Sequence, residues 1–193
     1  MKQFFTIIAL TLLAPLSFAQ YFTLTPNGFL SEGKNNYTVV DFPNTKQNNI
    51  YKNVLNALNT MYKDPKKVLT LVDGESITIN GYEEYVIPHR AKSNPIQIGK
   101  TNYEFDLSYT ISILFKDNKM RINSPTFECK RWMTTDYSAK WVYLTLNKDK
   151  KSKASIYGKE NEINAQDSYD ALNKHFNNLI AEIVKKSKTV NDW

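Results

Sequence analysis

The sequence predicts an α+β fold in which two helices pack on one face of an antiparallel β-sheet. Residues 105–116 alternate apolar and polar side chains, which is typical of a strand with one buried face. Two other segments, 45–63 and the stretch that follows Asn164, repeat apolar residues at helical spacing. One alternating sheet and two amphipathic helices bury all their apolar stripes only when both helices cover the same face. The other face of the sheet is therefore expected to be open.

The first strand and the first helix are predicted near the start of the domain. Residues 37–42, YTVVDF, are rich in aromatic and β-branched types, and Pro43 closes this strand. Asn44 followed three places later by Gln47 resembles a capping box, so the amphipathic helix is expected over 45–63.

A meander of short strands is predicted next. The dipeptides Asp73-Gly74 and Asn80-Gly81 both favour positive φ and predict turns within residues 68–87. A loop over residues 88–99 then leads to the long strand, 103–116.

The long strand is predicted to turn back at Asp117-Asn118. A two-residue turn places Phe115 opposite Met120 and Ile113 opposite Ile122, which keeps apolar residues facing one another. The side chains expected in the core are Phe105, Leu107, Tyr109, Ile111, Ile113 and Phe115. The outward side chains should form a flat, wet surface: Glu104, Asp106, Ser108, Thr110 and Ser112.

The last third of the chain contains a less regular segment and a second helix. Pro125 interrupts the return strand, and residues 126–146 are expected to form a further hairpin or an excursion from the sheet edge. Asn164 with Asp167 begins a long helix. Its apolar stripe consists of Tyr169, Leu172, Phe176, Leu179, Ile180, Ile183 and Val184.

The amino end predicts export. Lys2 precedes an apolar run, and Ser17-Phe18-Ala19 supplies small residues at the cleavage position, so residues 1–19 are interpreted as a signal peptide. The run is too short for a membrane helix of about 20 residues, and no transmembrane segment is expected in the mature chain. Residues 20–36 are predicted to be a leader that lies on the domain without a strand of its own, and residues 37–193 a single domain. The expected location is periplasmic or secreted.

Charge and cysteine content exclude several classes of partner and chemistry. The formal net charge is +6, but the lysines are scattered along the chain, and the outward face of the long strand lacks the basic and aromatic residues of a nucleic-acid-binding sheet. No nucleic-acid partner is therefore expected. Cys129 is the only cysteine, so no intrachain disulfide forms, and we interpret it as a buried small hydrophobe. His89 and His175 belong to no recognisable motif.

The sequence contains no motif of an established enzyme class. A Gly-rich phosphate loop, a G-x-S-x-G elbow, an H-E-x-x-H pair and a calcium-loop spacing are all missing, so no cofactor and no metal are predicted. Pairs such as Glu83-Glu84 are interpreted as solvated charges. A hydrolase-like envelope enzyme without a recognisable motif is the alternative to a non-catalytic protein.

Three segments resemble a known family. DFPNTKQNNIYKNVL, SITINGY and above all YTISILFKDNKMRINSPTFEC are similar to a secreted Bacteroidetes domain of unknown function with a TATA-binding-protein-like (TBP-like) fold. The resemblance extends over roughly the whole mature chain, and Asn118 stands where glycine is usual. It implies the order strand, helix, four strands, helix. It implies no catalytic residue, substrate or cofactor.

The candidate binding residues lie after Pro125. Arg131, Trp132, Tyr137 and Trp141 are of the residue types enriched at interface hot spots. An alternative interpretation is that the two tryptophans close one edge of the core. The sequence therefore predicts an exported, non-catalytic binding or assembly module of the cell envelope, whose partner is an unidentified protein or envelope ligand.

Overall fold

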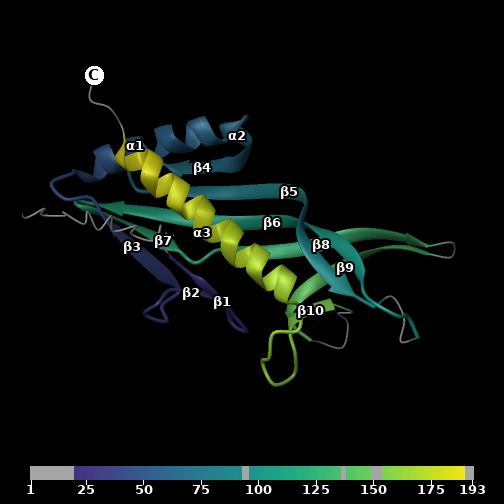
Figure 1. The fold of residues 1–193 in the computed structure, drawn as a ribbon. Helices are drawn as coiled ribbons and strands as arrows, with labels where there is room; N and C mark the ends of the chain where they lie inside the picture. The colour runs from purple at the N-terminus through teal and green to yellow at the C-terminus, as the bar shows by residue number, and fades with distance from the viewer. Residues whose placement is uncertain (1–19, 93–95, 136–137, 149–153, 190–193) are drawn as a thin grey trace, which may run out of the picture.

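The fold is a twisted β-sheet with its helices packed on one face (Figure 1). The computed structural model describes residues 20–92, 96–135, 138–148 and 154–189. The predicted signal peptide lies outside these residues. Within them, the α+β class predicted from the sequence is confirmed. None of the described helices is long and apolar enough to cross a membrane.

The described elements begin with a small hairpin and end with the longest helix. In chain order they are β1 (Thr23–Thr25), β2 (Gly28–Leu30), β3 (Tyr37–Asp41), α1 (Gln47–Met61), α2 (Pro65–Val68), β4 (Leu69–Val72), β5 (Ser76–Ala91), β6 (Thr101–Lys116), β7 (Lys119–Asn123), β8 (Thr126–Thr135), β9 (Ser138–Asn147), β10 (Ala154–Tyr157) and α3 (Gln166–Lys188). Seven strands, not four, separate the described helices α2 and α3, which corrects the order that the family resemblance implied.

Strand β6 is the centre of the main sheet, whose order is β10-β9-β8-β6-β5-β4. Strands β7 and β8 pair with different halves of the same edge of β6, and β3 pairs with β7. Ser124 and Pro125 interrupt the pairing between these two halves, as the proline predicted. Only β10 runs parallel to its neighbour, β9, among the described pairs of this sheet.

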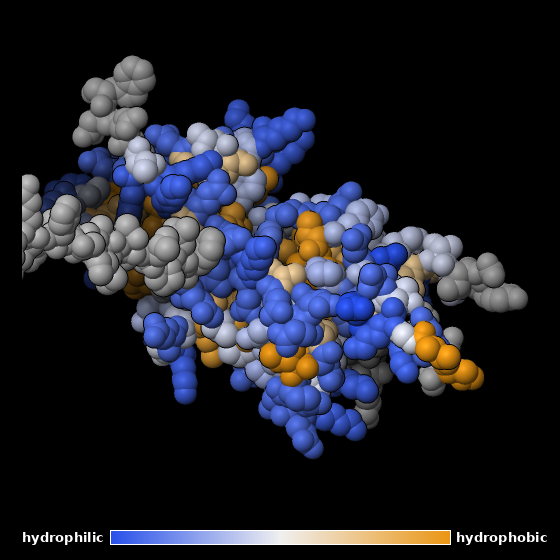
Figure 2. Space-filling model, in the orientation of Figure 1, coloured by the Kyte–Doolittle hydropathy of each residue, from blue (hydrophilic) through white to orange (hydrophobic). Residues whose placement is uncertain are grey.

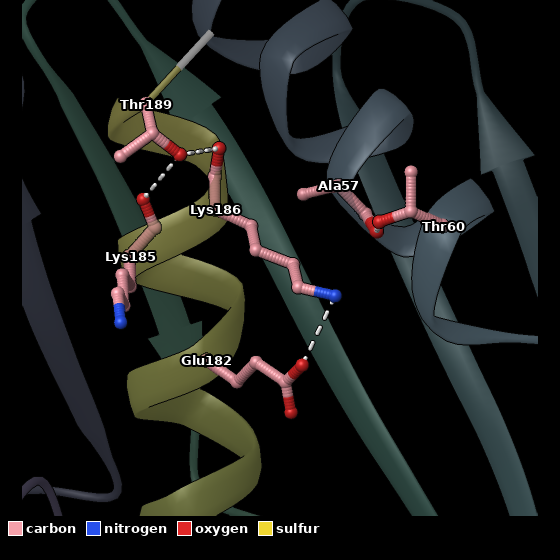
Figure 3. A network of polar contacts seen from close by, with 6 residues as sticks. All are labelled: Ala57, Thr60, Glu182, Lys185, Lys186 and Thr189. Carbon is pink, nitrogen blue, oxygen red and sulfur yellow. Dashed lines mark hydrogen bonds and ion pairs between the residues drawn. The ribbon is translucent and has the colours of Figure 1, made fainter.

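The helices cover the face of β6 predicted to be the core. All six predicted core residues of β6 are buried, from Phe105 to Phe115. The α3 stripe is buried at Leu172, Phe176, Ile180, Ile183 and Val184. Figure 3 shows the C-terminal end of α3 beside α1. There the ammonium of Lys186 lies 3.0 Å from the carboxylate of Glu182, and both side chains are partly exposed to solvent.

The β6–β7 hairpin has the predicted register, with Phe115 opposite Met120 and Ile113 opposite Ile122. Its turn also caps α1. The carboxylate of Asp117 accepts a hydrogen bond from the backbone N–H of Gln47 at 2.8 Å. The predicted capping box is therefore wrong, since the residue before the helix is Lys46, which makes no side-chain cap.

Strand β5 is continuous where the sequence predicted a turn and a loop. Asn80-Gly81 lies within the strand, and β5 continues through Pro88 to Ala91. A Cβ atom at Gly81 would overlap the ring of Tyr109 on β6, so glycine is required here for packing rather than for a turn.

The N-terminal leader forms a two-stranded hairpin, contrary to the prediction that it has no strand. It packs on α3 through two asparagine side chains that replace a neighbouring strand. Asn177 Oδ1 accepts hydrogen bonds from the backbone N–H groups of Tyr21 and Phe22, and Asn173 Oδ1 accepts one from Leu24. The apolar side chains of the hairpin, Phe22, Leu24 and Phe29, are buried in the common core.

Candidate binding site

The sheet divides into two arms at one end. Strands β6 and β8 pair from Asp106↔Lys130 to Thr110↔Thr126 and are not paired beyond Asp106. One arm then consists of the ends of β5 and β6, and the other is the β8–β9 hairpin (Figure 1). We call this division the fork.

A bulge in β5 lies directly beside the fork. The β5–β6 register shifts between Glu83 and Ile87, and Tyr85 in this bulge has a φ of +56°. The Asp106 carboxylate accepts hydrogen bonds from the Tyr85 backbone N–H at 3.0 Å and from the Tyr82 hydroxyl at 3.1 Å. Asp106 is thus buried, although the alternation placed it on a wet surface. Its carboxylate holds the bulge at which β5 changes direction.

Arg131 joins the two arms at the base of the fork. Its guanidinium donates a hydrogen bond to the backbone oxygen of Glu104 at 3.0 Å and lies over the ring of Tyr103. The Nε atom is buried without a hydrogen-bond partner. Arg131 is therefore turned toward the helix-covered side of the sheet.

The tryptophans lie on the opposite side, which we call the outer face. Trp132 and Trp141 are directly paired across β8 and β9, with ring centroids 5.2 Å apart in an edge-on arrangement. Trp132 is 50% exposed and Trp141 is 44% exposed. Tyr143, one pair further along the hairpin, is also 44% exposed. Lys130 lies opposite Tyr143, and its ammonium is 5.2 Å from the ring centre of Trp141.

The structure thus brings together only part of the candidate set. Trp132 and Trp141 share the outer face, whereas Arg131 points to the other side and Tyr137 lies outside the described residues. Tyr143 was missed by the sequence analysis. The alternation of β9 contains the signal for it, since Trp141 and Tyr143 are two residues apart and must share a face.

A hollow of about 470 Å³ lies on the inner side of the fork. Its walls come from both arms and from β10, and no residue of α1 or α3 lines it. The described lining residues are His89, Ala91, Lys92, Tyr103, Phe105, Met133, Ser138, Lys140, Val142 and Ala154. The sequence analysis gave no indication of this hollow, because it depends on how far two strands diverge.

His89 is fixed at the back of this hollow. The Ser168 hydroxyl donates to the backbone oxygen of Pro88 at 2.6 Å and lies 3.2 Å from His89 Nδ1. Since the only hydroxyl proton is used in the first bond, Nδ1 is the donor in the second, and the neutral ring carries its proton there. Burial and the charge of Lys100 lower the pKa of His89. The ring is therefore neutral near pH 7.

Two other groups have nucleophile or acid–base chemistry. Cys129 is buried, and burial raises the pKa of its thiol to about 12, so it is neither accessible nor ionised. This confirms its interpretation as a small core residue. His175 Nε2 lies 3.5 Å from the carboxylate of Glu83 and packs edge-on against Tyr109. Burial lowers the pKa of His175 despite the nearby carboxylate. No group of three or more metal-ligating side chains occurs in the part of the chain that the structure describes.

Comparison with known proteins identifies the domain. Residues 37–130 match the family described as a domain of unknown function (DUF4468) with TBP-like fold. This segment belongs to the DUF4468 family. The family resemblance and the TBP-like fold predicted from the sequence are thus confirmed, although the match covers 37–130 rather than the whole mature chain. No curated protein matches the sequence.

Two crystal structures have a similar fold. A TBP-like protein from Parabacteroides distasonis ATCC 8503 is 13% identical, with a TM-score of 0.50 over 80% of this chain and 92% of that one. A DUF4468 family protein from Bacteroides ovatus ATCC 8483 is 11% identical, with a TM-score of 0.51 over 81% of this chain and 87% of that one. The DUF4468 match ends at Lys130, the last residue of β8 that pairs with β6. The free arm of the fork therefore lies beyond the matched segment.

Proposed function

We propose that this protein is an exported, non-catalytic binding module of the cell envelope. Its recognition surface is the outer face of the β8–β9 hairpin. The observation that carries the proposal is the pair formed by Trp132 and Trp141, two large aromatic side chains in mutual contact and each about half exposed. Large exposed aromatic side chains that cluster on one surface are typical of interaction sites.

The arrangement around this pair fits recognition better than closure of the core. The residues of β8 and β9 that point inward, such as Cys129 and Leu144, are the ones that pack against the rest of the protein. The tryptophans project in the opposite direction. Arg131 supports the surface from behind by tying the hairpin to β6.

The export part of the proposal is supported by residues 1–19 alone. Their apolar run and small-residue cleavage position have the form of a signal peptide. Mass spectrometry of the mature N-terminus after fractionation of the cell tests this part. A chain that begins at Gln20 in an envelope or secreted fraction supports it, and an uncleaved cytoplasmic chain contradicts it.

Truncation of a tryptophan tests the recognition surface. Trp132→Ala should change the free energy of unfolding by less than about 1 kcal/mol, because the ring is half solvated. It should markedly reduce the recovery of a partner that is first identified with the wild-type protein in an envelope extract and then purified. Leu114→Ala is the matched control, since Leu114 is an exposed apolar residue of β6 outside the hairpin.

The same variant distinguishes the alternative role. A loss of about 3 kcal/mol or more in Trp132→Ala would mean that the ring closes the edge of the core and would contradict the proposal. Equal recovery of the purified partner by Trp132→Ala and Leu114→Ala would also contradict it.

A further inference from the structure

The fork hollow is an apolar surface on the side of the sheet that the helices otherwise cover. Tyr103 and Phe105 from β6 form one wall, and Met133 and Val142 from the β8–β9 hairpin form the other. Its volume of about 470 Å³ is in the range of small-molecule sites, which is about 300–1,000 Å³. An apolar body of modest size would bury itself between the two walls.

The charged side chains among the described lining residues of the hollow have one sign. Lys92 and Lys140 are among its lining residues, and no acidic residue is among the described ones. Lys100 is close enough for its charge to act on His89 at the back of the hollow. The charge of Asp167 raises the pKa of His89 and so opposes the effect of Lys100, but its carboxylate is paired with Arg90 at 3.8 Å. The combination of apolar walls and two lysines complements a molecule with an apolar body and an anionic head.

We propose that the fork hollow binds a single-chain anionic amphiphile, such as a fatty carboxylate. The chain lies between Tyr103, Phe105 and Val142, and the head group lies at the ammonium groups of Lys92 and Lys140. This site is on the opposite side of the hairpin from the tryptophans and does not depend on the function proposed for the outer face.

The loop at the end of the β5–β6 arm suggests where such a molecule is taken up. Ile96 is 92% exposed and Ile98 is 100% exposed in this loop. Figure 2 shows apolar atoms projecting at the lower right, where Figure 1 places this loop. Exposed isoleucines flanked by lysines are suited to contact with an anionic lipid surface. The amphiphile has two possible sources, a free carboxylate in solution and a lipid in a membrane.

A fluorescence displacement experiment tests the site. The purified protein is titrated with cis-parinaric acid, and the bound probe is then displaced with decanoate or with decanol, which share a ten-carbon chain but differ in charge. We expect decanoate to displace the probe at concentrations about fivefold lower than decanol, because it adds a charge interaction with the lysines. Failure of decanoate to displace the probe, or equal potency of the two compounds, would overturn the proposal.

Two variants locate the binding. The double variant Lys92→Gln with Lys140→Gln should lower the affinity for decanoate about fivefold and leave the affinity for decanol unchanged. Lys116 is an exposed lysine at the far end of β6, so Lys116→Gln should change neither affinity. Ala91→Phe places a ring in the hollow and should weaken both compounds about tenfold or more. Unchanged decanoate affinity in the lysine variant would overturn the proposal even if Ala91→Phe fails to fold.

Vesicle binding identifies the source of the ligand. Sedimentation with phosphatidylglycerol vesicles that is reduced both by Ala91→Phe and by the lysine variant supports uptake from a membrane. Decanoate binding without vesicle binding supports uptake from solution. Vesicle binding that is lost only in Ile96→Ser with Ile98→Ser, together with no decanoate binding, would overturn the proposal. Trp132→Ala should leave the displacement curves unchanged, which separates this site from the outer face.

Discussion

The two ends of the sheet are built differently. At the end that carries β3 and β7, each strand is paired with its neighbours, and the inner face is covered by α1 and the C-terminal half of α3. Ile111, Ile113 and Ile122 there are completely buried. At the fork, the strands separate, and inward residues such as Val142 and Met133 line an open hollow. One sequence thus combines a closed core with an end at which part of the apolar surface remains accessible to solvent or to a ligand.

This difference shows how the same alternating pattern serves two purposes. In the closed end, inward side chains from facing strands and helices exclude water and stabilise the fold. At the fork, the alternating pattern continues, but no helix covers the strands. The first turn of α3, which starts at Gln166, marks the limit of the covered region. Inward residues beyond the start of α3 therefore have no helix to pack against and do not contribute to the closed core. Substitutions at each end of the sheet, and changes of pH, should therefore have different effects.

The largest effect is expected in the closed end. Ile111→Ala should reduce the free energy of unfolding by about 2–5 kcal/mol, because a fully buried side chain leaves a cavity. Val142→Ala at the fork should cost about 1 kcal/mol or less, since its side chain is only half buried. Urea unfolding followed by circular dichroism measures both. Similar costs for the two variants would remove the distinction between the ends.

A second substitution tests what holds the fork open. Asp106→Ala should destabilise the protein by about 1.5–3 kcal/mol, because it removes a charged acceptor from two hydrogen bonds beside the bulge. Hydrogen exchange should then rise first in the arm formed by the ends of β5 and β6. The matched control is Ser108→Ala, the next outward residue of β6. Increased exchange confined to the closed end would contradict this role.

Histidine titration provides a third test, since His89 lies at the fork and His175 lies under the middle of the sheet, against Glu83 and Tyr109. Burial lowers the pKa of both below the usual value near 6.5. The unfolded chain therefore binds more protons as the pH falls through 6.5, and the free energy of unfolding should decrease from pH 7 toward pH 5. The decrease should end once the pH lies below the folded-state values.

Substitution of each histidine assigns this pH dependence. His89→Asn retains an N–H near the position of Nδ1 and should remove the contribution of His89 at the fork. His175→Gln should remove the contribution of the histidine beside Glu83. Thermal unfolding at several pH values measures both. If neither variant reduces the dependence of the melting temperature on pH, the pKa values of the two histidines are not lowered in the folded protein.

The smallest expected effect concerns the turn that caps α1. Asp117→Ala should lower the melting temperature slightly, because the Gln47 N–H loses its acceptor. The hydrogen bond from Gln47 lowers the pKa of Asp117, so this stabilisation is present at neutral pH and is lost as the pH falls through the lowered pKa of the folded state. A melting temperature difference between wild type and Asp117→Ala that persists at pH 2 would contradict this explanation.

The features predicted correctly from the sequence are those set by local chemistry. The register of the β6–β7 hairpin follows from a two-residue turn and alternating side chains, and both helices follow from their apolar stripes. The errors concern residues whose role depends on a distant partner. Gly81 was predicted to form a turn, but glycine is needed there because the ring of Tyr109 occupies the space of a side chain. The cap of α1 comes from Asp117 rather than from Asn44.

The candidate site was predictable only in part for the same reason. The aromatic composition of residues 126–146 identified Trp132 and Trp141, and alternation along β9 adds Tyr143. Arg131 and Trp132 are consecutive residues of β8, so the same alternation places them on opposite faces. The hollow depends on where β8 separates from β6, and the bulge in β5 lies beside this separation. No local pattern encodes that separation, so the hollow could not be derived from the sequence.

The hydrogen bonds between the N-terminal hairpin and the asparagines of α3 have a consequence for the order of folding. Tyr21 and its hydrogen-bond partner Asn177 are 156 residues apart, so nearly the whole chain must be available before this contact can form. Until then, Phe22, Leu24 and Phe29 have no helix to pack against. Contacts of such long sequence separation slow folding, because the entropy of closing the loop is lost before the contact forms. A growing chain therefore keeps its first strands exposed to solvent until its last helix has been made.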